Sequence, residues 1–350
     1  MKAVILAGGL GTRLRPLTET VPKVLVPIVN RPFIFHQMEW LKRQGVTDII
    51  LSLFYLSEKV EEVLQKVVGE LNISFQVSHE TKPLGTGGAV RKALSLLDDQ
   101  PFLVLNGDIL TDLDLRPLEE LFHGGLALTL VEVEDPTRYG VVRFDDQFNV
   151  VEFVEKPPAD KITSRWINAG IYILSPALFH DVPEDQPFSF ERDLFPRWLR
   201  EGISFRACPL EGYWRDIGKP QSYLEAHWDI LDGEFETAIH GDLRRPSVWV
   251  QGNVSVDPTA RLVGPLILGD RCSVGPEATV GPRTVIGDHV IVESHARVTG
   301  SVVWAHSRIG DSSVVEDAIL GNHCRIESGA HVESGSVFAD RSIVAGGVSR

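Results

Sequence analysis

The 350-residue sequence predicts an α/β fold, in which a doubly wound, mainly parallel (Rossmann-like) domain is followed by a parallel β-helix. Strand-like and helix-like segments alternate through residue 231, which is typical of doubly wound sheets. A loop rich in glycine and cationic residues follows the first apolar run, where such sheets bind ligands. Beyond residue 248, apolar residues recur every six positions, which is the period of a β-helix.

The first domain is assigned to residues 1–231 and opens on the apolar run AVILA at 3–7, which predicts a buried parallel strand. β-Branched and apolar runs predict further strands, and apolar residues at helical spacing predict helices. The further strands are expected at 48–53, 73–77, 102–105, 141–144, 150–154 and 169–174. The helices are expected at 32–44, 57–68, 87–97, 190–200 and 220–231. The last three strands have no full helix between them, which predicts an antiparallel insertion on one side of the sheet.

The second domain is expected at residues 248–343, after a linker at 232–247. Its six-residue repeat slips by one residue before Ile309 and before Leu320. At about three hexapeptides per coil, each coil would turn one apolar residue inward per face. The repeat residues are Leu268, Val274, Val280, Ile286, Val292, Val298, Trp304, Ile309, Val315, Leu320, Ile326, Val332 and Phe338.

Composition narrows the range of ligands and locations. The formal net charge of −14 argues against nucleic-acid binding. Residues 1–45 run against this trend, with seven Lys and Arg side chains and two acidic ones, which favours a small polyanion as ligand. Three isolated cysteines, Cys208, Cys272 and Cys324, predict neither a disulfide framework nor a zinc site and favour the cytoplasm. No apolar stretch approaches the length of a membrane span, so no membrane association is expected.

The loop at residues 6–23 (LAGGLGTRLRPLTETVPK) carries the main chemical signal. Glycines let backbone N–H groups approach phosphate oxygens, and cationic side chains neutralise a polyphosphate. The spacing does not fit a dinucleotide fingerprint, because Leu14 stands where its last glycine is required. A P-loop is also excluded, since no Gly-Lys-Ser/Thr is present. The glycines, hydroxyl and cations of the loop are Gly8, Gly9, Gly11, Thr12, Arg13, Arg15 and Lys23.

The pattern G-G-x-G-T-R-L-x-P-L-T at 8–18, followed by P-K at 22–23, resembles the signature of the sugar-1-phosphate nucleotidyltransferases. The repeats of the tail resemble the left-handed β-helix family, whose hand goes against the usual right-handed crossover rule. The resemblance implies an enzyme that joins an NTP and a sugar 1-phosphate into an NDP-sugar and releases pyrophosphate. It also implies Mg²⁺ as the cofactor.

Two aspartates are the candidate metal ligands. Asp108 ends the strand at 102–105 in the sequence Asn-Gly-Asp, and Asp216 lies in the aromatic segment GYWRDIG at 212–218. The resemblance implies that these two carboxylates together hold Mg²⁺, and oxygen-only ligands suit its octahedral preference. A turn aspartate at 108 and a helix N-cap at 216 are the structural alternatives.

The resemblance also implies roles for the loop residues. Lys23 resembles the lysine that contacts the α-phosphate of the nucleotide, and Arg13 resembles the arginine that holds the departing pyrophosphate. With Asp108 and Asp216 these two form the expected catalytic set. The expected nucleotide-binding residues are Leu6, Ala7, Gly8, Gly9, Gly11, Thr12, Arg13, Glu80, Gly85 and Thr86.

Glu80 begins the segment ETKPLGT, which looks like the mannose-1-phosphate guanylyltransferase branch of this family. A carboxylate only accepts hydrogen bonds and could take both the N1–H and the N2–H of guanine. This residue therefore favours GTP, with a solvated loop glutamate as the alternative.

The segment VEFVEKP at 151–157 matches the E-K-P motif of the family, in which the glutamate bonds sugar hydroxyls and the lysine pairs with the sugar phosphate. Glu152 and Glu155 are not on the same face of a strand, so at most one of them faces the site. The resemblance selects Glu155, and it also matches the segments RYG at 138–140 and INAG at 167–170 to the lining of the sugar pocket. The expected sugar-phosphate residues are Tyr139, Gly140, Glu155, Lys156 and Asn168.

The favoured reaction is direct in-line attack of mannose 1-phosphate on GTP, which gives GDP-mannose and pyrophosphate. A glucose-1-phosphate thymidylyl- or uridylyltransferase, a heptose-1-phosphate guanylyltransferase and a non-catalytic sensor of sugar nucleotides remain open. The β-helix is expected to support a homo-oligomer, with acyl transfer by one of its histidines as the alternative. Those histidines are His289, His295, His306, His323 and His331.

Overall fold

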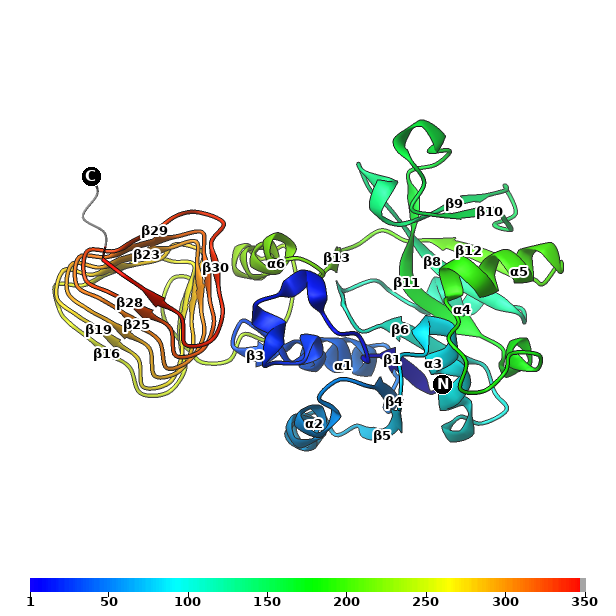
Figure 1. Cartoon of the computed structure of the whole chain (residues 1–350), viewed down its shortest axis with the longest axis horizontal. Helices are drawn as coiled ribbons and strands as arrows, with labels where there is room; N and C mark the ends of the chain where they lie inside the picture. Colours follow the sequence, from blue (N-terminus) through cyan, green and yellow to red (C-terminus); the bar gives the residue numbers. More distant parts are fainter. Residues whose placement is uncertain (347–350) are drawn as a thin grey trace. The chain divides into compact units, whose positions relative to one another are not determined.

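The computed structural model describes residues 1–346 (Figure 1). The described chain divides into two compact units. Unit 1 comprises Met1–Leu10 and Gln37–Trp214, and unit 2 comprises Gly11–His36 and the chain from Arg215 onward. The loop at 6–23 is therefore shared between the units, since its part up to Leu10 belongs to unit 1 and its remainder to unit 2. The predicted domains, which end at residue 231 and begin at residue 248, are continuous stretches of the chain, unlike these two units. Their boundaries stay a prediction.

A nine-stranded mixed sheet forms the centre of unit 1, with strand order β10-β9-β11-β6-β1-β4-β5 and with β8 and β12 joined to it through β11. The pairs β6–β1, β1–β4 and β4–β5 are parallel, whereas β11–β6 and β10–β9 are antiparallel. The strands are β1 (Ala3–Leu6), β4 (Asp48–Leu53), β5 (Ser74–His79), β6 (Phe102–Asn106), β8 (Leu126–Glu132), β9 (Gly140–Phe144), β10 (Val150–Glu155), β11 (Trp166–Leu174) and β12 (Phe205–Pro209). The doubly wound sheet and its antiparallel insertion are confirmed.

Helices separate the parallel strands, and short strands complete the chain up to the end of α6. The helices are α1 (Phe33–Arg43), α2 (Ser57–Leu71), α3 (Gly85–Ala93), α4 (Arg116–Leu121), α5 (Phe195–Arg200) and α6 (Pro220–Asp232). The short strands are β2 (Pro27–Ile28), β3 (Arg31–Pro32), β7 (Ile109–Thr111) and β13 (Trp214–Asp216). The helix predicted at 190–200 is continuous but begins with a wider π-type turn over Phe190–Leu194. Its aromatic side chains pack in a buried cluster that includes Phe190, Phe195 and Trp198.

Unit 2 contains the β-helix, whose coils stack as parallel strands in three sheets (Figure 1). Val248 pairs with Leu266 in the next coil, an offset of three full hexapeptides. Val302 pairs with Ile319, an offset that is one residue shorter. The register places one slip before Leu320, as predicted, and the other before Val303, which pairs with Ile286 and with Leu320, rather than before Ile309. The prediction that Trp304 is an inward repeat residue is therefore wrong, since Val303 takes that place in the buried core and Trp304 hydrogen-bonds Tyr223 on α6. A Cβ on Gly269 would lie 2.6 Å from the backbone of Gly287 in the next coil, which explains the recurring glycines. The left hand of the β-helix stays a prediction.

The strands of unit 2 after α6 are short. They are β14 (Asp242–Arg245), β15 (Val248–Val250), β16 (Ser255–Val256), β17 (Arg261–Leu262), β18 (Leu266–Leu268), β19 (Ser273–Val274), β20 (Thr279–Val280), β21 (Thr284–Ile286), β22 (Ile291–Val292), β23 (Arg297–Thr299), β24 (Val302–Val303), β25 (Arg308–Ile309), β26 (Val314–Glu316), β27 (Ile319–Leu320), β28 (Arg325–Ile326), β29 (His331–Val332), β30 (Val337–Phe338) and β31 (Ile343–Val344). Three of the histidines considered for acyl transfer stack on one another, with ring centroids 4.7 Å apart for His289–His306 and 4.8 Å apart for His306–His323.

A buried histidine on α6 is expected to make the stability of unit 2 depend on pH. His227 is fully buried, its Nδ1 accepts a hydrogen bond from Val29 N (3.3 Å), and burial lowers its pKa to about 3. The unfolded chain binds a proton on this group near pH 6.5, whereas the folded chain does not. The free energy of unfolding should therefore fall as the pH is lowered from about 6.5 towards 3, by about 1.4 kcal/mol per pH unit.

Urea unfolding of the wild type and of His227→Gln, followed at several pH values, measures this dependence. The variant should lose part of the slope between pH 6 and 4, on the order of one proton. Equal slopes in the two proteins would show that the histidine is protonated in the folded state.

Candidate active site

In unit 1, the candidate site begins where the parallel strands β1 and β6 end. Leu6 pairs with Asn106, and the N–H of Gly107 donates to the carbonyl of Leu6 (3.0 Å). A Cβ on Gly107 would lie 2.4 Å from that carbonyl oxygen, so only glycine permits this approach. Asp108 follows and is partly exposed. The candidate metal ligand therefore lies at the carboxyl edge of the parallel strands, beside the start of the signature loop.

Glu80 lies beside the same loop. Its Oε1 accepts from Ser52 Oγ (2.9 Å) and its Oε2 accepts from Leu84 N (2.9 Å). A Cβ on Gly8 would lie 2.7 Å from Glu80 Oε1, so the absence of a side chain at Gly8 makes room for the carboxylate. Glu80 is thus held in a fixed position next to the predicted nucleotide loop, and each oxygen keeps a lone pair for a further donor.

Ser52 was not among the predicted site residues. It lies in β4 opposite Leu6 and is fully buried, and its hydroxyl contacts the carboxylate of Glu80. A polar residue inside the apolar run at 48–53 is the signal in the sequence that could have identified it. Thr86, by contrast, was predicted to bind nucleotide, but its hydroxyl already donates to Glu191 (3.1 Å) and accepts from Phe190 N (2.8 Å).

The predicted sugar residues Gly140 and Glu155 face each other across β9 and β10. A Cβ on Gly140 would lie 3.1 Å from Glu155 Oε2, and the side chain of Glu155 is only 17% exposed. The Nζ of Lys156 lies 2.9 Å from the Oε1 of Glu155, and the side chain of Lys156 is largely exposed. Glu152 bonds Arg143 (3.2 Å) instead, so the two glutamates have different surroundings, as strand alternation predicts.

The remaining sugar-pocket predictions involve Tyr139 and Asn168. The ring of Tyr139 contacts that of Trp214 edge to face at 5.5 Å, and Trp214 Nε1 donates to Ala169 O (2.8 Å). Asn168 is buried; its amide donates to Tyr172 Oη (2.8 Å), and its oxygen accepts from Gly170 N (2.9 Å). Burial raises the pKa of Tyr172 well above its ordinary value, which keeps the hydroxyl neutral. These two hydrogen bonds of Asn168 fix the amino-terminal part of β11. This structural role is independent of any contact with a sugar.

In unit 2, Gly11 lies directly against Lys23. Its φ of +62° lies in the left-handed region, and its carbonyl accepts from Leu14 N (2.9 Å) and from Thr18 Oγ1 (2.7 Å). A Cβ at this position would lie 3.2 Å from the Cβ of Lys23. Gly11, which precedes the short helical turn Thr12–Leu14, thus leaves room for Lys23 at the start of the turn Lys23–Leu25.

Arg13 and Asp216 form an ion pair in unit 2, with Nη1 and Oδ2 3.7 Å apart. The side chain of Arg13 is 57% exposed, whereas that of Asp216 is 18% exposed. The neighbouring Arg215 bonds Glu225 (2.5 Å) and Asp229 (2.7 Å) on α6. The sequence did not predict the pairing of Arg13 with Asp216, because 203 positions separate the two residues (216 minus 13).

Gly218 makes room for this ion pair and was not predicted to matter. A Cβ there would lie 2.6 Å from Asp216 Oδ1 and 2.9 Å from Arg13 Nη2. Gly218→Ala should therefore displace both side chains and lower kcat for nucleotidyl transfer about 30-fold, which corresponds to roughly 2 kcal/mol of activation free energy. Steady-state kinetics of pyrophosphate release measure the effect.

Gly233→Ala, at the end of α6, is the control for adding a methyl group to unit 2, because no atom lies within 4 Å of its added Cβ. It should keep full activity despite some loss of stability from its φ of +86°. Full activity of Gly218→Ala would show that the ion pair is not needed.

Asp108 and Asp216 offer the donor chemistry that Mg²⁺ prefers, since both are carboxylates. Among residues 1–346, no three His, Cys, Asp or Glu side chains cluster in a way that could hold a metal ion. Two carboxylates suffice for magnesium at a polyphosphate site, where water and phosphate oxygens complete the shell.

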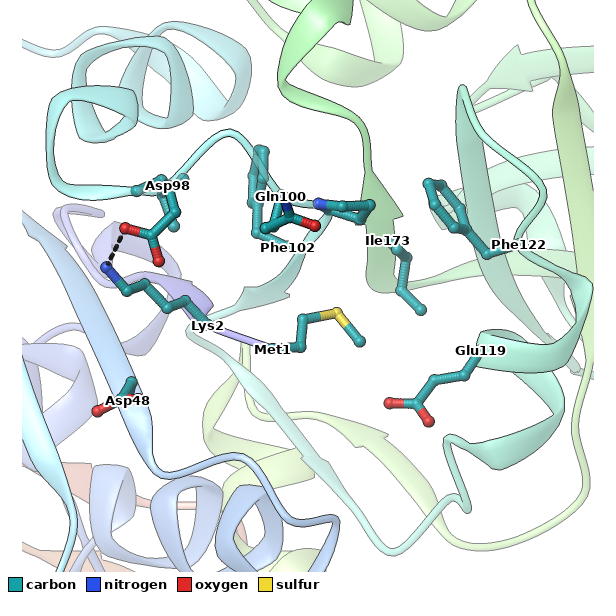
Figure 2. A pocket seen from close by; sticks show the side chains of 11 residues that line it. Met1, Lys2, Asp48, Asp98, Gln100, Phe102, Glu119, Phe122 and Ile173 are labelled. Atoms are coloured by element: carbon teal, nitrogen blue, oxygen red, sulfur yellow. Dashed lines mark hydrogen bonds and ion pairs between the residues drawn. The ribbon is translucent and has the colours of Figure 1, made fainter.

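A cavity of about 590 Å³ opens in unit 1 away from all of the predicted site residues (Figure 2). Met1, Lys2, Phe102 and Glu119 are among the residues that line it, and Lys2 Nζ bonds Asp98 Oδ1 at 3.1 Å. Met1, Lys2 and Phe102 lie at or before the amino-terminal ends of β1 and β6, so the cavity is at the opposite end of those strands from Asp108.

Comparisons with known proteins match both parts of the chain. The family model described as nucleotidyl transferase matches residues 2–233, and the one described as GMPPB C-terminal domain matches residues 262–349. The chain is 42% identical to a mannose-1-phosphate guanyltransferase of Candida albicans, over 97% of this chain and 91% of that protein. It is 39% identical to mannose-1-phosphate guanyltransferase beta-A of Xenopus laevis, over 94% of this chain and 89% of that protein.

Solved structures resemble about two thirds of the chain. HddC from Yersinia pseudotuberculosis, in complex with GMP-PN, is 38% identical with a TM-score of 0.57, over 64% of this chain and 97% of that one. No helix within residues 1–346 combines the length and the apolar character needed to cross a membrane.

Proposed function

The chain belongs to the nucleotidyl transferase family, and from this we propose that it transfers a guanylyl group from GTP to mannose 1-phosphate, which gives GDP-mannose and pyrophosphate. The observation that carries the choice of substrates is the 42% identity to a mannose-1-phosphate guanyltransferase over 97% of the chain. The position of Glu80 beside Gly8 supports the choice of guanine.

In the proposed reaction, an oxygen of the sugar phosphate attacks the α-phosphorus of GTP in line with the leaving pyrophosphate. The new P–O bond forms as the bond between the α-phosphorus and the bridging oxygen breaks, and pyrophosphate leaves with that electron pair. Asp108 and Asp216 would hold Mg²⁺, which when bound supplies positive charge to the phosphate oxygens.

Four further side chains bind the phosphate groups and the sugar. Lys23 contacts the α-phosphate and stabilises the charge that develops there. Arg13 is paired with Asp216 in this structure and is exposed enough to turn to the leaving pyrophosphate instead. Lys156 pairs with the phosphate of the sugar, and Glu155 accepts hydrogen bonds from sugar hydroxyls.

Pyrophosphate release across a matrix of nucleotides and sugar phosphates tests this function. The nucleotides are GTP, UTP, dTTP, CTP and ATP, and the acceptors are mannose, glucose, N-acetylglucosamine and heptose 1-phosphates, with and without Mg²⁺. We expect the fastest release with GTP, mannose 1-phosphate and Mg²⁺. If pyrophosphate release is fastest with UTP or dTTP, the proposed nucleotidyl transfer stands, but GTP is not the nucleotide substrate.

Glu80→Gln should weaken the preference for GTP over UTP about 10- to 100-fold, because one of the two acceptor oxygens of the carboxylate becomes an NH2 group, which donates and cannot accept from the N–H groups of guanine. The measured quantity is the ratio of kcat/KM for the two nucleotides. Glu152→Gln is the control, since this glutamate bonds Arg143 instead. An unchanged ratio in Glu80→Gln would show that Glu80 does not contribute to recognition of the base.

A further inference from the structure

A strained hairpin follows Lys23 in the chain and lies within unit 2. Strands β2 and β3 pair through a turn in which Val29 has a φ of +44° and Asn30 a φ of +65°. A β-branched residue such as Val29 is rarely found in the left-handed region, and such strain persists only where the surrounding structure fixes the backbone. The neighbours of this hairpin therefore decide its conformation.

Those neighbours come from α6 and from the β-helix. Tyr223 Oη donates to the carbonyl of Pro27 (2.5 Å) and accepts from Trp304 Nε1 (2.9 Å). Asn30 Nδ2 donates to the carbonyl of Ile286 (2.8 Å) in the β-helix. Tyr223 and Trp304 are almost completely buried, so neither can exchange its hydrogen bond for one with water.

The hairpin is joined to Lys23 by a short and closed segment. Val26 N donates to the carbonyl of Lys23 (3.2 Å), and Phe33 N, just after β3, donates to the carbonyl of Val26 (3.0 Å). Lys23 itself packs against Gly11, beside the turn that carries Arg13. A shift of Pro27 would therefore be passed on to the backbone that positions both cationic side chains.

We propose that Trp304 and Tyr223 are positioning residues for nucleotidyl transfer, through which the β-helix fixes the segment that carries Lys23 and Arg13. The two residues touch no substrate; they hold the carbonyl of Pro27 by a chain of two hydrogen bonds, of which the one between Trp304 and Tyr223 is buried. The proposal rests on the proposed function, because it takes Lys23 and Arg13 as the phosphate contacts. It gives the β-helix a part in catalysis without an active site of its own.

The chain provides a matched control. Trp228, also on α6, donates its Nε1 to the carbonyl of Gly300 in the β-helix (3.0 Å). Trp228→Phe thus removes one indole hydrogen bond between the same two elements, and this bond does not involve the segment at 11–36. Comparison of Trp304→Phe with Trp228→Phe separates the positioning of the loop from general stability of unit 2.

The experiment measures kcat and KM for Tyr223→Phe, Trp304→Phe and Trp228→Phe, and follows hydrogen–deuterium exchange of peptides from residues 11–36. We expect the first two variants to lower kcat about 10-fold, to leave KM for the sugar phosphate within about twofold, and to exchange faster in this segment. Trp228→Phe should have the kcat of the wild type and the wild-type rate of exchange in residues 11–36. Its thermal midpoint should be similar to that of Trp304→Phe.

Two results would overturn the proposal. One is exchange in residues 11–36 that stays at the wild-type rate in Tyr223→Phe and Trp304→Phe. The other is a loss of kcat that is as large in Trp228→Phe as in Trp304→Phe. A wild type that is inactive with every substrate pair would instead refute the proposed function, and the exchange data would still decide whether Tyr223 and Trp304 order the loop.

Discussion

Asp108→Asn is expected to lower kcat for nucleotidyl transfer about 1,000-fold, because a neutral amide cannot replace a carboxylate as a magnesium ligand at a polyphosphate. The change is nearly isosteric and the position is partly exposed, so the free energy of unfolding should change by less than about 1 kcal/mol. Pyrophosphate release at saturating GTP, sugar phosphate and Mg²⁺ gives kcat, and urea unfolding gives the stability.

Asp114→Asn is the control for this change. Asp114 follows a short way along the chain and pairs with Arg116, and the side chains of both residues are exposed. It should retain wild-type kcat within about twofold, since exposed ion pairs contribute little. Near-normal, magnesium-dependent turnover in Asp108→Asn would contradict the role of Asp108 as a metal ligand.

Lys23→Met is expected to lower kcat about 100- to 1,000-fold, which is the usual cost of removing one charge-stabilising donor from a reacting centre. Methionine keeps the aliphatic part of the side chain, so the packing of Lys23 against Gly11 should be preserved. KM for the sugar phosphate should change little, because Lys156 is proposed to bind that group. Stopped-flow or quench measurements of a single turnover isolate the chemical step.

The exposed Lys161 provides the matched substitution, and Lys161→Met should behave as the wild type. A thermal midpoint that falls in parallel with the activity of Lys23→Met would identify Lys23 as a structural residue instead.

Local patterns in the sequence predicted most of the fold. Stacked coils appear where the repeat was predicted, and the slip before Leu320 appears as a coil that is shorter by one position. The other slip was misplaced, because Val303 and Trp304 are both apolar and the sequence alone did not show that Val303 is the inward residue. Apolar runs predicted the strands, because every strand that is buried on both faces must be apolar along its length. The helix at 190–200 was predicted, but its π-type first turn was not, since that detail depends on how its aromatic side chains pack.

Contacts between distant positions could not be predicted in this way. Nothing in the loop at 6–23 indicates that its part from Gly11 onward groups with the β-helix, because that grouping depends on Tyr223, Trp304 and Asn30. The pairing of Arg13 with Asp216 and the contact between Ser52 and Glu80 are likewise tertiary. The candidate residues came from motif spacing, whereas their positioning partners became visible only in three dimensions.

The most direct test of the account follows the α-phosphorus of GTP. The enzyme is incubated with mannose 1-phosphate, Mg²⁺ and GTP labelled at either the α- or the γ-phosphorus, and the products are separated. The account predicts that the α-label is recovered in GDP-mannose and the γ-label in pyrophosphate, and that EDTA stops both. Release of the γ-label as free phosphate, with no label in a sugar nucleotide, would contradict guanylyl transfer.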